Sequence, residues 1–215
     1  MTRASIKLNL GCGPSGLDGW LNYDWGALPL LSKLPFLRRL LIKFRLLPAG
    51  YDVAWPKIQL VDIRKRLPLA DGNVDFIYCS QVLEHMERWE ALHVLRECHR
   101  VLVPGGCLRV SVPDLAHICR AYLAGTGERP AQEACRLLWG HPKDIAPANA
   151  LSRWSRRFIR PHEWGYDHAE MTLLLQEAGF SDIRSCHFRE GTMPDLDRAE
   201  LDVHAAHSLY IETFK

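Results

Sequence analysis

The sequence predicts an open α/β fold, a doubly wound sheet with helices on both faces, from three observations. A short apolar run at residues 7–10 leads directly into a glycine-containing turn at residues 11–13. Two further apolar runs, residues 20–24 and 58–63, contain or end in an acidic residue. A segment with helical spacing, residues 89–101, then precedes another apolar run. This alternation of apolar strands and helices is typical of a doubly wound sheet.

The turn after the first predicted strand is suited to the close approach of a nucleotide-like ligand. Gly11 and Gly13 lack a Cβ atom, so their backbone can adopt positive φ and come near a molecule at the carboxyl end of the strand. A Gly-x-Gly pattern also occurs in ordinary turns, so its meaning depends on the segments that follow.

Acidic residues accompany the second and third predicted strands. A doubly wound fold places, after its second strand, the acid that accepts hydrogen bonds from ribose hydroxyls, and Asp24 is our candidate for it. A turn-forming aspartate is the alternative interpretation. Asp62 stands near the end of the third run in the same way.

The remaining elements continue the alternation. Residues 75–80 form a fourth apolar run and residues 107–112 a fifth. Between them, residues 89–101 place apolar side chains on one helical face, which predicts a helix packed on the sheet. A capping-box pattern begins a further helix at Asp167, and Gly179 ends it.

In their order, these segments resemble the class I S-adenosylmethionine-dependent methyltransferases of the compact methyltransferase-type-11-like family. The resemblance rests on LNLGCGP at the first strand, Asp24 after the second, LPLADGNVDFIYCSQVLEHM around the fourth and LRECHRVLVPGGCLRVSVPDL before the fifth. It covers about half of the chain. It implies a Rossmann-like mixed seven-stranded sheet, in which residues 180–188 and 209–214 form the antiparallel edge.

The resemblance, together with the strand-end positions, implies how S-adenosyl-L-methionine would be bound. Asp24 would hold the ribose hydroxyls, Trp25 would pack on the adenine face, and Asp62 would accept a hydrogen bond from the exocyclic amine of adenine. The other residues expected along the cofactor are Gly11, Cys12, Gly13, Ile63, Ser80 and Gln81.

The chain departs from the family pattern at two places. Asn9 replaces the usual acidic residue, so a contact to the amino end of the cofactor would use a neutral amide. Residues 13–20 are too few for the full helix that normally separates the first two strands. The loss of a helix N-terminus matters little for a cationic sulfonium but much for a pyrophosphate, which disfavours a nicotinamide cofactor.

Methyl transfer is an in-line displacement, so the protein mainly has to orient the acceptor and exclude water. A hydroxyl acceptor also needs a base. The candidates are His162, His85 and Asp114, with His162 favoured over His85 for acceptor contact. The alternative interpretation is that these histidines serve packing and helix capping.

A basic insertion at residues 28–51 follows the second strand. Its apolar side chains share one helical face: Phe36, Leu37, Leu40, Leu41, Phe44 and Leu47. Its basic side chains are Lys33, Arg38, Arg39, Lys43 and Arg45. One interpretation is a lid helix with its apolar face in the core. The other is that residues 33–47 contact an anionic membrane surface or a lipid-linked acceptor.

A second insertion, at residues 115–164, lies where this fold keeps its acceptor-binding elements. Four arginines alternate with aromatic side chains over residues 153–166. Such a segment can clamp an anionic group and stack on a sugar ring, or it can be a solvated basic face with tryptophans in the core.

Composition is that of an ordinary globular protein: 215 residues, of which 47% are hydrophobic and 24% charged. We expect a single methyltransferase domain over residues 1–215. The net charge of +2 gives no reason to expect a nucleic-acid partner.

The seven cysteines lack a Cys-x-x-Cys pair, so we expect reduced core thiols and no metal site. The sequence contains no apolar leader or membrane span, so it predicts a cytoplasmic protein. Residues 33–47 favour peripheral contact of this protein with the inner face of the membrane.

Three functions are therefore compared. The favoured one is an S-adenosylmethionine-dependent methyltransferase that acts on a small-molecule, glycan or lipid-linked saccharide acceptor. The alternatives are a non-catalytic S-adenosylmethionine-binding or membrane-associating protein and, less favoured, a nicotinamide-dependent oxidoreductase.

Overall fold

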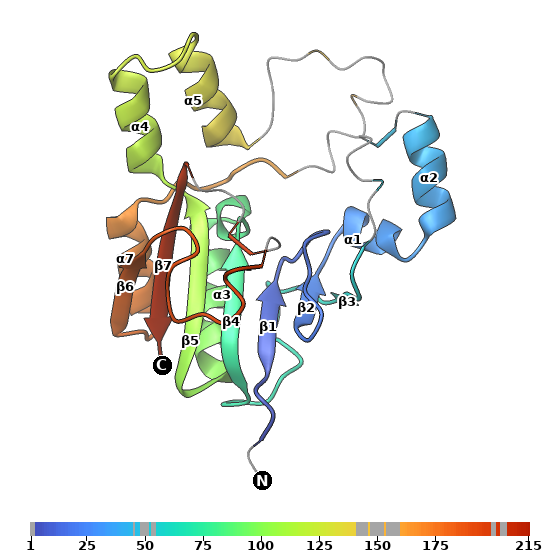
Figure 1. Cartoon of the computed structure of the whole chain (residues 1–215), viewed down its shortest axis with the longest axis vertical. Helices are drawn as coiled ribbons and strands as arrows, with labels where there is room; N and C mark the ends of the chain where they lie inside the picture. Colours follow the sequence, from blue (N-terminus) through green and yellow to red (C-terminus); the bar gives the residue numbers. More distant parts are fainter. Residues whose placement is uncertain are drawn as a thin grey trace.

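A computed structural model describes residues 3–44, 46–47, 52, 55–140, 146, 153, 160–198, 201–202 and 206–215. In these residues, seven strands form one mixed sheet in the order β3-β2-β1-β4-β5-β7-β6 (Figure 1). The strands are β1 Lys7–Leu10, β2 Leu21–Asp24, β3 Gln59–Leu60, β4 Val74–Ser80, β5 Leu102–Pro113, β6 Asp182–Cys186 and β7 Ser208–Phe214.

The sheet has the predicted mixed topology. Strands β1 to β5 pair in parallel, with Asn9 of β1 opposite Asn22 of β2 and Tyr78 of β4. The antiparallel strand is β7, which runs against both β5 and the edge strand β6. The carboxyl ends of the parallel strands therefore meet along one edge of the sheet, which is where open α/β folds bind ligands.

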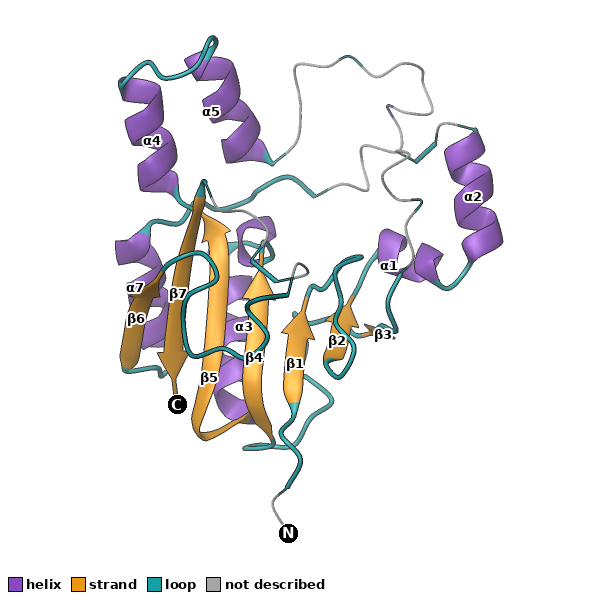
Figure 2. Cartoon of the chain, in the orientation of Figure 1, coloured by secondary structure: helices purple, strands orange, loops and turns teal. Residues whose placement is uncertain are grey.

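Helices lie behind the sheet and beyond its carboxyl edge (Figure 2). They are α1 Ala27–Ser32, α2 Pro35–Lys43, α3 Arg88–Val101, α4 Leu115–Leu123, α5 Pro130–Trp139 and α7 His168–Glu177, with a single 3₁₀ turn, η2, at Leu83–His85. The helices predicted at residues 89–101 and after Asp167 are both confirmed, as α3 and α7. Asp167 caps α7 by accepting a hydrogen bond from the Glu170 amide at 2.8 Å, as its sequence pattern predicts. The crossover from β1 to β2 contains no helix, as its length predicts.

One face of the sheet carries the main apolar core. Leu8, Ile77 and Leu108 from the strands pack with buried side chains of α3 and α7, among them Leu95 and Leu174. Fully burying a leucine or isoleucine contributes about 1.5–3 kcal/mol, so this face provides most of the driving force that holds the strand ends together.

The opposite face is covered by the segment before β7, which ion pairs hold against the sheet. Arg109 of β5 is 0% exposed and forms ion pairs with Asp202 and with Glu212 of β7. The Tyr78 hydroxyl donates to Asp202 at 2.8 Å. A smaller apolar cluster, which includes Trp20, shares Tyr78 with this network.

The basic insertion differs from a lid packed in the core. It folds as two short helices. Phe36 of α2 is 81% exposed, and Phe44, the residue that follows α2, is 62% exposed. Arg38 is the buried residue of α2. Arg45 of the insertion lies outside the described residues. The prediction of one domain over residues 1–215 stays a prediction. In the part of the chain that is described, no helix is long and apolar enough to cross a membrane.

Candidate functional site

A cavity of about 690 Å³ opens at the carboxyl ends of the parallel strands. Its walls come from the turn after β1, the end of β2, the segment after β3 and the turn after β4. The sequence-predicted residues that line it are Gly11, Gly13, Asp24, Trp25, Asp62, Ile63, Gln81 and His85. The topology therefore brings most of the predicted cofactor residues to one site, together with one predicted base.

The glycine turn and Asp24 form one hydrogen-bonded unit. Gly11 and Gly13 have φ of +65° and +51°, which side-chain-bearing residues rarely adopt. The Gly13 amide donates to one oxygen of Asp24 at 2.7 Å, and the Trp25 amide donates to the other at 2.6 Å. Burial raises the pKa of Asp24, while these two amides favour its charged form.

The Asp24 carboxylate keeps acceptor capacity for a ligand. A carboxylate offers about four lone-pair sites, and the two backbone amides occupy two of them. A Cβ atom at Gly13 would meet nothing within 4 Å, so the backbone here faces open space. This arrangement fits a ribose whose hydroxyls donate to Asp24.

Asp62 has a partner that the sequence interpretation did not include. Both of its oxygens accept from Arg64, at 2.9 and 3.0 Å. The pKa of Asp62 lies below its ordinary value because these hydrogen bonds and the arginine charge outweigh burial. The carboxylate lines the cavity in a fixed orientation, and its proposed contact with adenine stays a prediction.

Three predicted cofactor residues are not among those that line the cavity: Asn9, Cys12 and Ser80. Asn9 is buried within β1, where successive side chains point to opposite faces of the sheet. Burial raises the pKa of the Cys12 thiol to about 12, so it stays protonated. Their roles toward the cofactor stay predictions.

Gln81 carries strain at the cavity. Its φ of +55° is unusual for a residue with a side chain. The conformation is held by its amide, which donates to the Ser111 carbonyl at 2.8 Å, and by its side chain, which donates to the Ser208 hydroxyl at 3.2 Å. The turn after β4 is therefore fixed to β5 and β7.

The two predicted histidines lie together, whereas Asp114 lies elsewhere. The rings of His85 and His162 meet edge to face, with centroids 4.8 Å apart. Nδ1 of His85 lies 3.1 Å from the Pro161 carbonyl. Burial lowers the pKa of His85, so its neutral form dominates at pH 7. Asp114 is the N-cap of α4 and accepts from the Ala116 amide at 3.0 Å.

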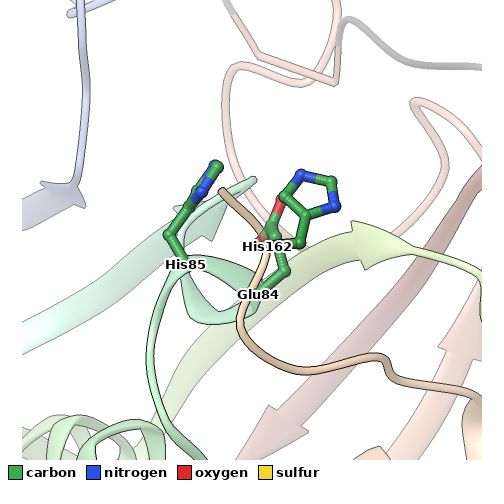
Figure 3. A group of neighbouring side chains, drawn as sticks. All are labelled: Glu84, His85 and His162. Carbon is green, nitrogen blue, oxygen red and sulfur yellow. The ribbon is translucent and has the colours of Figure 1, made fainter. Parts of the chain in front are cut away.

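Glu84 joins the histidines, although the sequence did not single it out. Its side chain is 1% exposed, and neither carboxyl oxygen has a hydrogen-bond partner among the described residues. Burial raises its pKa to about 8. Ligand atoms of Glu84, His85 and His162 all lie within 4.8 Å of one another (Figure 3). In the sequence, Leu-Glu-His is typical of residues that pack in the core or cap a helix. Only the tertiary structure reveals this cluster.

The arginine and aromatic segment is described in part. Arg160 lines the cavity, Trp164 is partly exposed, and Tyr166 is fully buried in the core. Residues 154–159 of the segment lie outside the described residues. Both interpretations of the segment stay predictions.

Known proteins match the chain in sequence and in fold. A family model described as a methyltransferase domain matches residues 42–110. A probable S-adenosylmethionine-dependent methyltransferase of Mycobacterium tuberculosis is 28% identical over 145 residues, which are 66% of this chain and 40% of the relative. A further probable S-adenosylmethionine-dependent methyltransferase, from Mycolicibacterium smegmatis, is 45% identical over 58 residues, which are 25% of this chain and 22% of that protein. The chain thus spans two fifths or less of the curated relatives it matches.

Solved structures share the fold. A methyltransferase from Methanosarcina mazei has a TM-score of 0.52 at 15% identity and covers 100% of this chain and 94% of its own. One from Mesorhizobium loti has a TM-score of 0.51 at 20% identity and covers 98% of this chain and 90% of its own. Both are S-adenosylmethionine-dependent methyltransferases. With the glycine turn and the strand-end acid in place, the sequence matches and the shared fold together support a class I S-adenosylmethionine-dependent methyltransferase, with S-adenosyl-L-methionine as the cofactor.

Proposed function

We propose that this protein transfers a methyl group from S-adenosyl-L-methionine to a hydroxyl of a small-molecule or saccharide acceptor. The observation that carries the proposal is one cavity that holds both the glycine turn with Asp24 and the imidazole of His85. Bound S-adenosyl-L-methionine supplies an electrophilic methyl group on a cationic sulfur.

The cofactor side of the cavity orients and holds S-adenosyl-L-methionine. The Asp24 carboxylate accepts hydrogen bonds from ribose hydroxyls with the lone pairs that the Gly13 and Trp25 amides leave. The indole of Trp25, which is half exposed at the cavity wall, covers an adenine ring. The short β1–β2 crossover suits a cationic cofactor, because it contains no helix and so places no helix N-terminus after β1.

The acceptor side provides a base and a cation. The Pro161 carbonyl accepts from Nδ1–H of His85, which leaves Nε2 with a lone pair that can take the proton of an acceptor hydroxyl. Arg160 lies on the same wall and can pair with an anionic group. Together with the exposed Trp164, this charge supports an acceptor with a sugar ring and an anionic group, such as a lipid-linked saccharide.

Binding and turnover test this function separately. S-adenosyl-L-methionine should raise the melting temperature of the protein, and NADH should not. Incubation with labelled S-adenosyl-L-methionine and a panel of saccharide, lipid-linked saccharide and protein acceptors should label a saccharide. A shift with NADH alone would identify an oxidoreductase. Cofactor binding without labelling of any acceptor would favour the non-catalytic binding protein.

Peripheral membrane contact is a second proposal, which rests on α2. Its exposed Phe36 and Phe44 accompany the basic side chains Arg39 and Lys43, with no acid in the helix. Such a surface suits an anionic lipid interface. The protein should co-sediment with phosphatidylserine-containing vesicles more than with neutral ones. Equal sedimentation with both would remove the proposal.

A further inference from the structure

Glu84, His85 and His162 converge beside the acceptor side of the cavity, and nothing in the proposed function uses all three. We propose that these side chains form a binding site for one divalent transition-metal cation of the zinc class. Two imidazoles and one carboxylate are the ligand set of catalytic zinc sites that keep a fourth position open. The sequence alone gave the opposite expectation, because the cysteine pattern contains no metal motif.

The Glu84 carboxyl is buried in surroundings that do not compensate for the loss of water. It is 1% exposed, and neither of its oxygens has a hydrogen-bond partner among the described residues. A buried carboxylate without a partner costs several kcal/mol, so buried charges are normally paired or coordinate a metal. Protonation alone would leave the new O–H group without an acceptor. A cation between Glu84 and the imidazoles accounts for the burial.

His85 is oriented as a metal ligand would be. A backbone carbonyl can only accept, so the 3.1 Å contact with Pro161 means that Nδ1 of His85 carries the proton. Nε2 then holds the lone pair. Metal-binding histidines almost always donate their other ring nitrogen to a carbonyl or a carboxylate in this way.

The backbone brings the third ligand to the first two. Glu84 and His85 are neighbours in the η2 turn, whereas His162 lies on a segment far along the chain. The amides of Glu163 and Trp164 both donate to the Glu84 carbonyl, at 2.7 and 3.3 Å, and thereby hold that segment against the turn. Figure 3 shows the three side chains extending to the same side of these two segments.

The spacing is close to that of a coordinated ion. The ligand atoms lie within 4.8 Å of one another. Ligand atoms that each lie ~2.1 Å from a tetrahedral zinc ion are about 3.4 Å apart. Side-chain rotations that move these atoms by about one ångström would therefore close the site. His85 also lines the cavity, so an open coordination position can face an acceptor. A cation bound to Nε2 of His85 would take the place of that nitrogen as the base, because it would polarise an acceptor hydroxyl and lower its pKa; this consequence rests on the proposed function.

The test measures metal binding without cofactor or acceptor. The chelator-treated protein is titrated with zinc chloride in a calorimeter, and cobalt chloride gives a visible spectrum that reports coordination number. The wild type should bind one zinc ion per chain. Glu84→Gln keeps the size of the side chain but removes its charge, and it should weaken zinc binding more than tenfold. His162→Gln should do the same.

His93→Gln is the matched control, because His93 is an exposed histidine of α3 outside the cluster. It should leave the zinc affinity unchanged. Absence of stoichiometric zinc binding, or zinc binding that survives both Glu84→Gln and His162→Gln, would overturn the proposal. Circular dichroism establishes that the variants are folded. S-adenosyl-L-methionine titration of Glu84→Gln reports on the proposed function separately, so either proposal can fail alone.

Discussion

Replacing Gly11 by alanine should destabilise the fold more than the same change at Gly13. Both residues have positive φ, so each substitution costs about 1–2 kcal/mol of backbone strain. Only at Gly11 would the new Cβ atom collide, lying under 3.0 Å from Cγ2 of Val82 and 3.2 Å from its Cγ1. Forcing a methyl group into a packed site costs about 1–3 kcal/mol. The expected losses are therefore roughly 2–5 kcal/mol for Gly11→Ala and roughly 1–2 kcal/mol for Gly13→Ala.

Urea unfolding at constant m-value measures both losses. The double variant Gly11→Ala with Val82→Ala isolates the collision, because Val82→Ala removes the two γ-methyl groups. In the Val82→Ala background, the cost of Gly11→Ala should fall to that of Gly13→Ala. Equal costs of the two glycine variants in the wild-type background, or a Gly11→Ala cost that does not change with Val82→Ala, would show that no collision with Val82 occurs.

Two further predictions concern buried charges. Arg109→Met should lower the free energy of unfolding by about 3–5 kcal/mol in a denaturant titration, because it leaves the Asp202 and Glu212 carboxylates buried without a cation; a loss below about 1 kcal/mol would contradict the ion network. The hydrogen bond from Arg100 holds the pKa of Glu97 below its ordinary value. Its contribution to stability is therefore complete above the unfolded pKa of ~4.3 and is lost as the pH falls through the folded pKa. The stability difference between wild type and Glu97→Gln should shrink from about pH 5 downward, and a difference that does not vary with pH would exclude this role.

The strand ends were predictable because they depend on local pattern. The apolar run into Gly11, the acid at Asp24 and the helical spacing before β5 each constrain the backbone within a few residues. The parallel topology then requires their carboxyl ends to meet at one edge. The cavity and most of its cofactor wall follow from these two facts. The antiparallel arrangement of β7 came from the family resemblance.

The proposed acceptor side of the cavity depends on contacts between distant segments, which the sequence pattern does not reveal. Glu84 looks like a packing residue in the sequence, and only the docking of the segment around His162 makes it a buried carboxyl without a partner. Asp114 looked like a base because it follows a strand, yet it caps α4. The exposed apolar face of α2 likewise depends on what packs nearby, not on its own periodicity.

The most direct test of the account is calorimetric titration of S-adenosyl-L-methionine into the wild type and the Asp24→Ala variant. Removal of the carboxylate eliminates the proposed acceptor for the ribose hydroxyls and releases the Gly13 amide. The wild type should bind S-adenosyl-L-methionine, and Asp24→Ala should bind it more than tenfold more weakly, a loss of about 1.4 kcal/mol or more. An unchanged affinity in Asp24→Ala, with the variant still folded, would mean that Asp24 does not bind the cofactor.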